Sequence, residues 1–311
     1  MPPLHSSLTT PFVSSRAPMR ARLAFGVIAF VVVSTSVGLA MTSLANDRAE
    51  VAVRATRARA DGAALLFAQS RMTSNALDES ARDDVNASTL TLKPHAKCAF
   101  VGDSQAREAY GAFANVARVD ESAVVDIRSS EKHRNWAHDL RDGGRATFTW
   151  APYASDAIEA LANAFAGDGE RAPDVVVLSC SLWHALNDDG GVATYARAMA
   201  TLGERLRGIQ ERYPRTTFAW LNAPTIRREL LSAANKIERF TEDNLRAYDD
   251  VQRDQDVVGV IQPRGPCVLI DVRAITAAAP VERCVDGVHY DGVVYDAVAR
   301  IVVDVARSRW R

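Results

Sequence analysis

The stretch of sequence that most constrains the fold is residues 98–107, which read Cys-Ala-Phe-Val-Gly-Asp-Ser-Gln-Ala-Arg. Its apolar first part predicts a short buried strand, and an apolar pattern at helical spacing begins directly afterwards, at Ala106. Ser104 therefore stands at a strand-to-helix turn, where the first amides of a helix can stabilise an oxyanion. The position suits a catalytic nucleophile, although Asp or Ser before a helix is also an ordinary N-cap.

A second short pattern lies near the other end of the chain. Asp286 and His289 are three positions apart in a glycine-containing turn, before a final predicted helix at 290–307. A serine hydroxyl is a weak nucleophile until a base takes its proton, and that base needs a group that holds its tautomer. Ser104, His289 and Asp286 supply these three residue types. Neither pattern is specific alone, but together they predict a catalytic triad.

The two patterns resemble the first and last sequence blocks of the SGNH (GDSL-like) hydrolase superfamily. The matching residues are Gly102-Asp103-Ser104 and Asp286-Gly287-Val288-His289. The resemblance is closest to the membrane-anchored branch, which includes the PC-esterase domain, the plant trichome birefringence-like proteins and the luminal domain of sialic acid O-acetyltransferases. In that branch the serine block is often Gly-Asp-Ser-x-x-Arg, which Arg107 matches. The resemblance spans about residues 97–311, and only the two end blocks are specific.

Strand-like and helix-like segments alternate between the two blocks. The predicted strands are 98–101, 124–127, 146–150, 174–180, 216–221 and 267–272, and the helices before the last are 156–165, 195–213 and 236–254. This alternation predicts an α/β fold with a parallel sheet covered on both faces. The resemblance implies the same architecture, a three-layer α/β/α sandwich. Its active site is expected at the carboxyl ends of the strands, where Ser104 is placed.

The N-terminal part of the chain predicts membrane attachment. Residues 1–22 contain three arginines and no acidic residue, and the 23 residues 23–45 carry no charge, which is long enough for a helix to span a bilayer. We therefore expect a cytoplasmic tail, a signal anchor at 23–45, a luminal stem at 46–96 and a catalytic domain at 97–311. Such a chain would be a single-pass membrane protein of the Golgi or another secretory compartment. A cleaved signal peptide ending at Ala45 is the alternative.

Four further residues are candidates for contact with substrate or oxyanion: Arg107, Ser181, Trp183 and Asn222. The superfamily generally carries a Gly-x-Asn block after the strand that here ends at 180, and its Asn helps to bind the oxyanion. This chain has Ser181 and Trp183 in those places, so the second oxyanion donor is left open. Trp183 is read either as a pocket wall for a sugar ring or as a core residue. Asn222 is read as a pocket residue or as turn chemistry, and Arg107 as a substrate contact or a solvated helix residue.

The four cysteines and the net charge bear on partners and cofactors. An even number of cysteines in an oxidising lumen invites disulfides. Cys267 and Cys284 frame the loop before the Asp-x-x-His turn and are the preferred pair, whereas Cys98 and Cys180 form a second bridge or stay buried thiols. No close Cys/His pair has the spacing of metal ligands, so no metal is expected. A net charge of −1 gives no reason to propose nucleic acid as a partner.

These observations predict a serine-dependent O-acyltransferase or carboxylic ester hydrolase, acting through an acyl-enzyme on the O-acetyl groups of a glycan or another acylated small molecule. An esterase needs no cofactor, whereas a transferase needs an acetyl donor such as acetyl-CoA. Both activities remain open. Two alternatives are a lipid or small-ester hydrolase of the same fold, and a catalytically inactive glycan-binding or scaffold protein. The second is motivated by the missing Gly-x-Asn block.

Overall fold

The computed structural model describes residues 92–117, 133–141, 143–166, 172–259 and 265–310. The expected tail, signal anchor and nearly all of the stem lie outside the described residues, as does the candidate strand at 124–127. Within the described ranges, no helix has the length and apolar character needed to cross a membrane.

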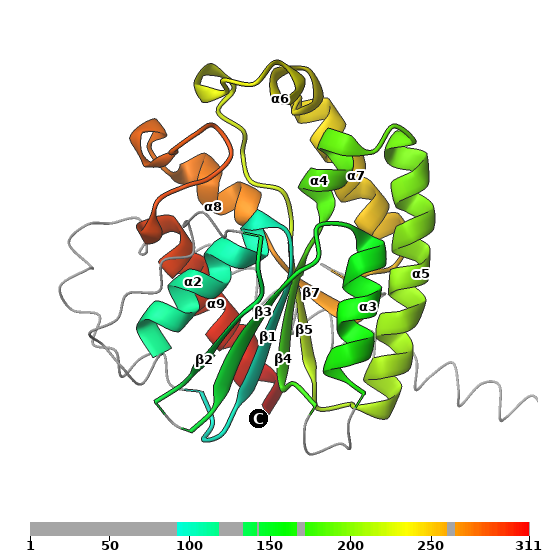
Figure 1. Cartoon of the computed structure of the whole chain (residues 1–311), viewed down its shortest axis with the longest axis vertical. Coiled ribbons are helices and arrows are strands. Elements are labelled where there is room, and N and C mark those ends of the chain that lie inside the picture. Colours follow the sequence, from blue (N-terminus) through cyan, green and yellow to red (C-terminus); the bar gives the residue numbers. More distant parts are fainter. Residues whose placement is uncertain (1–91, 118–132, 142, 167–171, 260–264, 311) are drawn as a thin grey trace, which may run out of the picture. The chain divides into compact units, whose positions relative to one another are not determined.

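A seven-stranded sheet forms the centre of the described domain, with the strand order β2-β3-β1-β4-β5-β7-β6 (Figure 1). The edge strand β2 is antiparallel to β3, and all the other neighbours are parallel. The strands are β1 Lys97–Gly102, β2 Trp136–Asp139, β3 Arg145–Trp150, β4 Val175–Ser179, β5 Thr217–Leu221, β6 Val258–Gly259 and β7 Cys267–Ile270.

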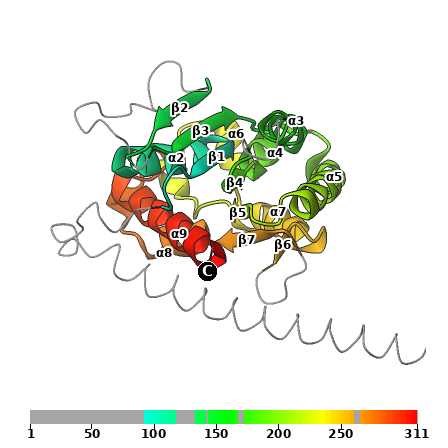
Figure 2. The same ribbon diagram turned by 90° about the horizontal axis from the view of Figure 1, so that it is seen from below.

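Helices cover both faces of this sheet (Figure 2). One face carries α2 Ser104–Ala117, α8 Val272–Ala278 and α9 Gly292–Trp310. The other carries α3 Ala154–Ala164, α5 Gly191–Arg212 and α7 Glu242–Asp254. Shorter pieces lie at the carboxyl edge of the sheet, at the top of Figure 1: α4 Ser181–Asn187, η4 Arg228–Leu230, α6 Ala234–Arg239 and η5 Val281–Arg283.

The central strand β4 shows why the chain folds into these layers. All five of its residues are buried, as expected for a parallel strand covered on both faces. Its side chains alternate between two core clusters, with Val175 and Val177 in one and Val176 and Leu178 in the other. This alternation is the two-residue period of a strand. The sheet therefore separates two apolar cores, and the predicted α/β/α sandwich is confirmed.

The helix predicted at 236–254 is two helices, α6 and α7. They are separated by Phe240 and Thr241, and the hydroxyl of Thr241 accepts a hydrogen bond from the amide of Asn244 at 3.2 Å. Thr241 is thus the N-cap of α7. The predicted strand at 267–272 ends at Ile270, because Asp271 caps α8 by accepting from the amide of Ala274 at 3.1 Å.

The expected disulfide between Cys267 and Cys284 is not formed. All four cysteines are buried free thiols. Cys98 and Cys284 belong to the core cluster on one face of the sheet, and Cys180 and Cys267 belong to the cluster on the other face. The sheet therefore separates the members of both expected pairs.

Candidate active site

The turn between β1 and α2 brings Ser104 to the carboxyl edge of the sheet. Gly102 has φ +153°, and a Cβ at this position would lie 1.9 Å from the carbonyl oxygen of Ser179. The amide of Asp103 donates a 2.8 Å hydrogen bond to the same oxygen. Only glycine permits this approach of β1 to β4, so the turn that presents Ser104 requires it.

Asp103 performs the capping role that the sequence left open for Ser104. The Asp103 side chain is fully buried, and its Oδ1 accepts from the amide of Gln105 at 3.0 Å and from the hydroxyl of Ser179 at 3.1 Å. Burial raises the pKa of Asp103 to about 6, although these hydrogen bonds act in the opposite direction. The hydroxyl of Ser104 meets a different partner.

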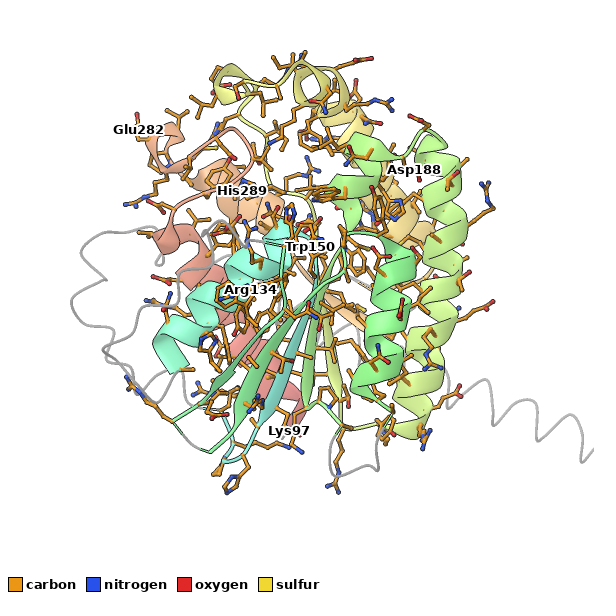
Figure 3. The ribbon with its side chains drawn as sticks, in the orientation of Figure 1. Lys97, Arg134, Trp150, Asp188, Glu282 and His289 are labelled. Carbon is orange, nitrogen blue, oxygen red and sulfur yellow. The ribbon has the colours of Figure 1, made fainter. Side chains whose placement is uncertain are left out.

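That partner is His289. The Nε2 atom of His289 lies 2.7 Å from the Oγ atom of Ser104, and its Nδ1 atom lies 2.8 Å from Oδ2 of Asp286. Figure 3 shows His289 above the carboxyl ends of the strands. When Nδ1 carries the proton and donates it to Asp286, Nε2 is free to accept the proton of Ser104. The three residue types predicted for a triad are therefore brought together in the hydrogen-bonded order that a triad requires.

A tight turn presents Asp286 and His289 together. The amide of Val285 donates to the carbonyl of His289 at 2.7 Å. Oδ1 of Asp286 accepts from the amides of Val288 and His289 at 3.0 and 2.8 Å. Gly287 adopts φ +87°, and a Cβ there would lie 2.6 Å from Leu231. The glycine in this pattern is thus needed both for its conformation and for its packing.

The surroundings of Asp286 keep it ionised. Burial alone would raise the pKa of this carboxyl group. The hydrogen bond from His289, the charge of His289 and the amides of His289 and Val288 outweigh burial and hold the pKa well below its usual range. Asp286 is therefore a carboxylate at neutral pH, and it can orient His289 and stabilise its charged form.

The loop after β5 holds this turn from outside, a role that the sequence did not indicate. The amide of Arg227 donates to the carbonyl of Gly287 at 3.0 Å, and its guanidinium donates to the carbonyl of Ala279 at 2.8 Å. The hydroxyl of Tyr290 donates to the carbonyl of Thr225 at 2.7 Å. These bonds connect the loop to both sides of the turn, but they involve backbone atoms and leave no pattern in the sequence.

Three of the residues expected to contact substrate have other partners or are shielded. Asn222 uses both ends of its amide on α8, donating to Asp271 at 2.9 Å and accepting from the amide of Arg273 at 3.2 Å. Arg107 is 5% exposed and pairs with Glu108 at 2.9 Å. Ser181 is fully buried, so its hydroxyl is closed to a substrate carbonyl. The contacts with α8 account for the placement of Asn222, whereas the ion pair of Arg107 is with its neighbour in α2.

His184 is buried in α4. Its Nε2 accepts from the amide of Ala154 at 3.0 Å, which places the ring proton on Nδ1, 3.2 Å from Oδ2 of Asp188. Burial lowers the pKa of His184, although Asp188 opposes this shift. The ring supports the first turn of α3 and is a structural residue.

Trp183, expected either as a pocket wall or as a core residue, lies in α4 directly after β4. Its ring is half-buried and contacts the rings of Trp150 at 5.5 Å, His133 at 5.7 Å and Tyr153 at 6.2 Å. Trp150 is the residue of β3 paired with Gly102, two positions before Ser104. These aromatic rings therefore line the same edge of the sheet as the triad.

Large apolar side chains are exposed on four segments of the described ranges, two of them beside or within the triad turn. The large hydrophobic residues that are exposed there are Leu230, Ile237, Val281 and Val285. They come from η4, α6, η5 and the triad turn, and Leu231 packs against Gly287, so η4 and the turn are neighbours. Among the described residues, no group of His, Cys, Asp and Glu side chains could hold a metal ion.

The chain was compared with known protein families, sequences and structures. No family model matches the sequence. The protein ALTERED XYLOGLUCAN 9 of Arabidopsis thaliana is 23% identical over 219 residues, which cover 65% of this chain and 58% of the plant protein. The chain therefore spans less than two thirds of that relative's length.

Solved structures of low sequence identity are also similar. A GDSL-like lipase from Parabacteroides merdae is 16% identical, with a TM-score of 0.41, over 70% of this chain and 98% of its own. An acetylxylan esterase from Geobacillus stearothermophilus is 13% identical, with a TM-score of 0.37, over 68% of this chain and 94% of its own. The mostly parallel sheet with helices on both faces is the α/β/α sandwich that the resemblance to the SGNH (GDSL-like) hydrolase superfamily implied.

Proposed function

We propose that this protein is a serine-dependent enzyme that removes or transfers O-acetyl groups of glycans. The observation that carries the proposal is the continuous chain of hydrogen bonds from Asp286 through His289 to Ser104, with distances of 2.8 and 2.7 Å. In such a chain the histidine accepts the serine proton and the carboxylate fixes its tautomer. We also propose that the enzyme acts in a secretory compartment, because residues 23–45 form an uncharged stretch long enough for a signal anchor.

The first half of the reaction forms an acyl-enzyme. His289 Nε2 takes the proton of Ser104 as Oγ forms a bond to the acetyl carbonyl carbon. The N-terminus of α2 supplies a partial positive charge for the resulting oxyanion. The bond between the carbonyl carbon and the sugar oxygen then breaks, and His289 returns the proton to that oxygen. The products of this step are acetyl-Ser104 and the free sugar hydroxyl.

The second half decides between esterase and transferase. Water or another sugar hydroxyl gives its proton to His289 and attacks the acetyl carbon, and the bond to Ser104 Oγ breaks as Ser104 regains its proton. The two activities share every step at the triad and differ only in the acceptor. The glycan substrate is supported by the half-buried aromatic rings beside Ser104 and by the name of the plant relative, which refers to xyloglucan.

A second candidate is an enzyme for esters with longer acyl chains. It is favoured by the exposed apolar side chains of Val285, in the triad turn, and Leu230, next to the Leu231 that neighbours Gly287. Turnover of p-nitrophenyl acetate and p-nitrophenyl octanoate separates the two candidates, because an apolar acyl site would favour the octanoate by about tenfold or more.

The test of the main proposal uses the full chain and a fluorophosphonate probe, which reacts with an activated serine. We expect wild type to be labelled and the Ser104→Ala variant not to be. Acetylated oligosaccharides then distinguish release of acetate into water from its appearance on an added acceptor glycan. Absence of labelling in a folded wild type would contradict the proposal.

A further inference from the structure

We infer that His133, Trp150, Tyr153 and Trp183 form a sugar-binding subsite, the aromatic corner, which takes a pyranose ring of the glycan next to the acetylated residue. The inference rests on the proposed function and names how that site recognises its substrate. It concerns binding rather than the chemical steps at Ser104.

The rings of the aromatic corner have a defined mutual geometry. His133 stacks on Trp150 with ring centroids 4.2 Å apart and an interplanar angle of 22°. Trp183 stands nearly perpendicular to both, at 84° to His133 and 86° to Trp150. The ring of Tyr153 is also nearly perpendicular to that of Trp183, at 84° with centroids 6.2 Å apart. Two walls of aromatic surface therefore meet at a right angle.

The burial of Trp183 and Tyr153 differs from that of the core aromatic residues, whereas Trp150 packs against the core cluster that contains Phe148. Phe100, Phe148 and Tyr110 are at most 1% exposed and belong to a core cluster. Trp183 and Tyr153 are half-buried, and among the described residues they fall in neither core cluster. The two rings contact each other, and Trp183 also contacts Trp150. Each ring contacts one histidine, His133 for Trp183 and His184 for Tyr153. Packing of the core therefore does not account for their large apolar surfaces.

The location of the aromatic corner ties it to the triad. Trp150 ends β3 and is paired with Gly102, and the amide of Ala151 donates to the carbonyl of Gly102 at 2.9 Å. Trp183 lies in α4, directly after the strand on the other side of β1. The corner thus draws on elements that flank the strand leading to Ser104. Figure 3 shows Trp150 at the carboxyl edge of the sheet, below His289.

Pyranose rings suit such a surface. The C–H groups of a sugar face are apolar and weakly positive, and the face of an aromatic ring is negative, so the two stack. A ring held by the aromatic corner would be displaced along the sugar chain from the residue that carries the acetyl group. The corner would then raise the affinity for oligosaccharides over that for small acetyl esters.

The test measures binding of cellohexaose and xylohexaose, both without acetyl groups, to the full chain by isothermal titration calorimetry. Trp183→Leu keeps apolar volume but removes the aromatic face, and we expect it to weaken binding about tenfold or more. Trp183→Phe keeps a ring and should remain within about threefold of wild type. Trp136→Phe, on the edge strand β2, is the matched control and should not change the affinity.

The outcomes separate this inference from the proposed function. Failure of folded wild type to bind either oligosaccharide, or equal binding by wild type and Trp183→Leu, overturns the aromatic corner. Neither result bears on the fluorophosphonate labelling of Ser104. If Trp183→Leu does not fold, Tyr153→Leu is used in its place, because Tyr153 belongs to the same corner and is expected to weaken binding in the same direction.

Discussion

His289 places its Nε2 atom 2.7 Å from the Oγ atom of Ser104, although 185 positions separate the two residues in the sequence. Ser104 is the first residue of α2, which follows β1, and His289 lies in the turn just before the last helix, α9. The parallel sheet brings the two together because the connections on both sides return the chain to its carboxyl edge. The relationship gives direct predictions.

Ser104→Ala should abolish esterase or transferase turnover and fluorophosphonate labelling. The change removes one hydroxyl from a turn that Gly102 and Asp103 hold, so the melting temperature should stay within a few degrees of wild type. Ser155→Ala, an exposed serine of α3, is the control and should retain full labelling. Labelling that persists in Ser104→Ala would place the nucleophile elsewhere.

Asp286→Asn should lower kcat by roughly 10³–10⁴-fold with little change in KM. Asn donates a hydrogen bond where the carboxylate accepts one, so it favours the tautomer of His289 whose Nε2 is already protonated. Rates with acetylated oligosaccharide over a range of substrate concentrations measure the effect. Glu282→Gln, four positions earlier in η5, is expected to match wild type. Wild-type kcat in Asp286→Asn would remove the carboxylate from the mechanism.

Gly287→Ala should reduce activity strongly, because the added Cβ lies 2.6 Å from Leu231 and 2.9 Å from the carbonyl oxygen of Arg227. The φ of +87° adds backbone strain of about 1 kcal/mol or more. Gly208→Ala is the matched control. Its Cβ meets no atom within 4 Å, and the position lies inside α5, so alanine should stabilise the protein by up to about 1 kcal/mol. Activity and thermal unfolding of both variants are to be measured together.

Arg227→Ala should lower kcat by about tenfold while KM stays near that of wild type, because the side chain fixes the end of α8 beside the triad turn. Arg227→Lys keeps a cationic donor and should recover part of the loss. Its exposed neighbour Arg228 provides the control variant, Arg228→Ala. An equal fall in kcat for Arg228→Ala would show that the effect is not specific to these hydrogen bonds.

The strand that composition marks most clearly is β4, which is buried on both faces. The run from Val175 to Ser179 is continuously apolar or small and lies entirely inside, so composition alone marks it. The edge strand β2 was missed, because its burial alternates and its sequence, Trp-Ala-His-Asp, lacks an apolar run. The short β6 and the seven-residue helices α4 and α8 carry too few residues to show a period.

In the candidate site, residues placed by local turns were predicted, and contacts that depend on tertiary packing were not. Ser104, Asp286 and His289 were predicted, because local turns with glycine place them and leave a pattern in the sequence. The contact of Asn222 with Asp271 was not predicted, because Asp271 lies 49 positions away and the contact depends on the packing of β5 beside β7. The Cys267–Cys284 pairing was wrong for a related reason. Nearness in sequence does not reveal which face of the sheet a side chain occupies.

The last prediction concerns the buried carboxyl group of Asp103. Its folded pKa of about 6 lies above the ordinary value of 3.8, so between pH 4 and 6 the folded state binds more protons than the unfolded state. The associated stability is fully present below about pH 4 and is lost as pH rises through 6, by about 3 kcal/mol at most. Asp103→Asn still offers an oxygen to Gln105 and Ser179 but does not titrate. Denaturant unfolding between pH 4 and 7 should therefore show wild type losing stability relative to Asp103→Asn as pH rises. A difference between the two proteins that stays constant over this range would mean that Asp103 titrates normally despite its burial.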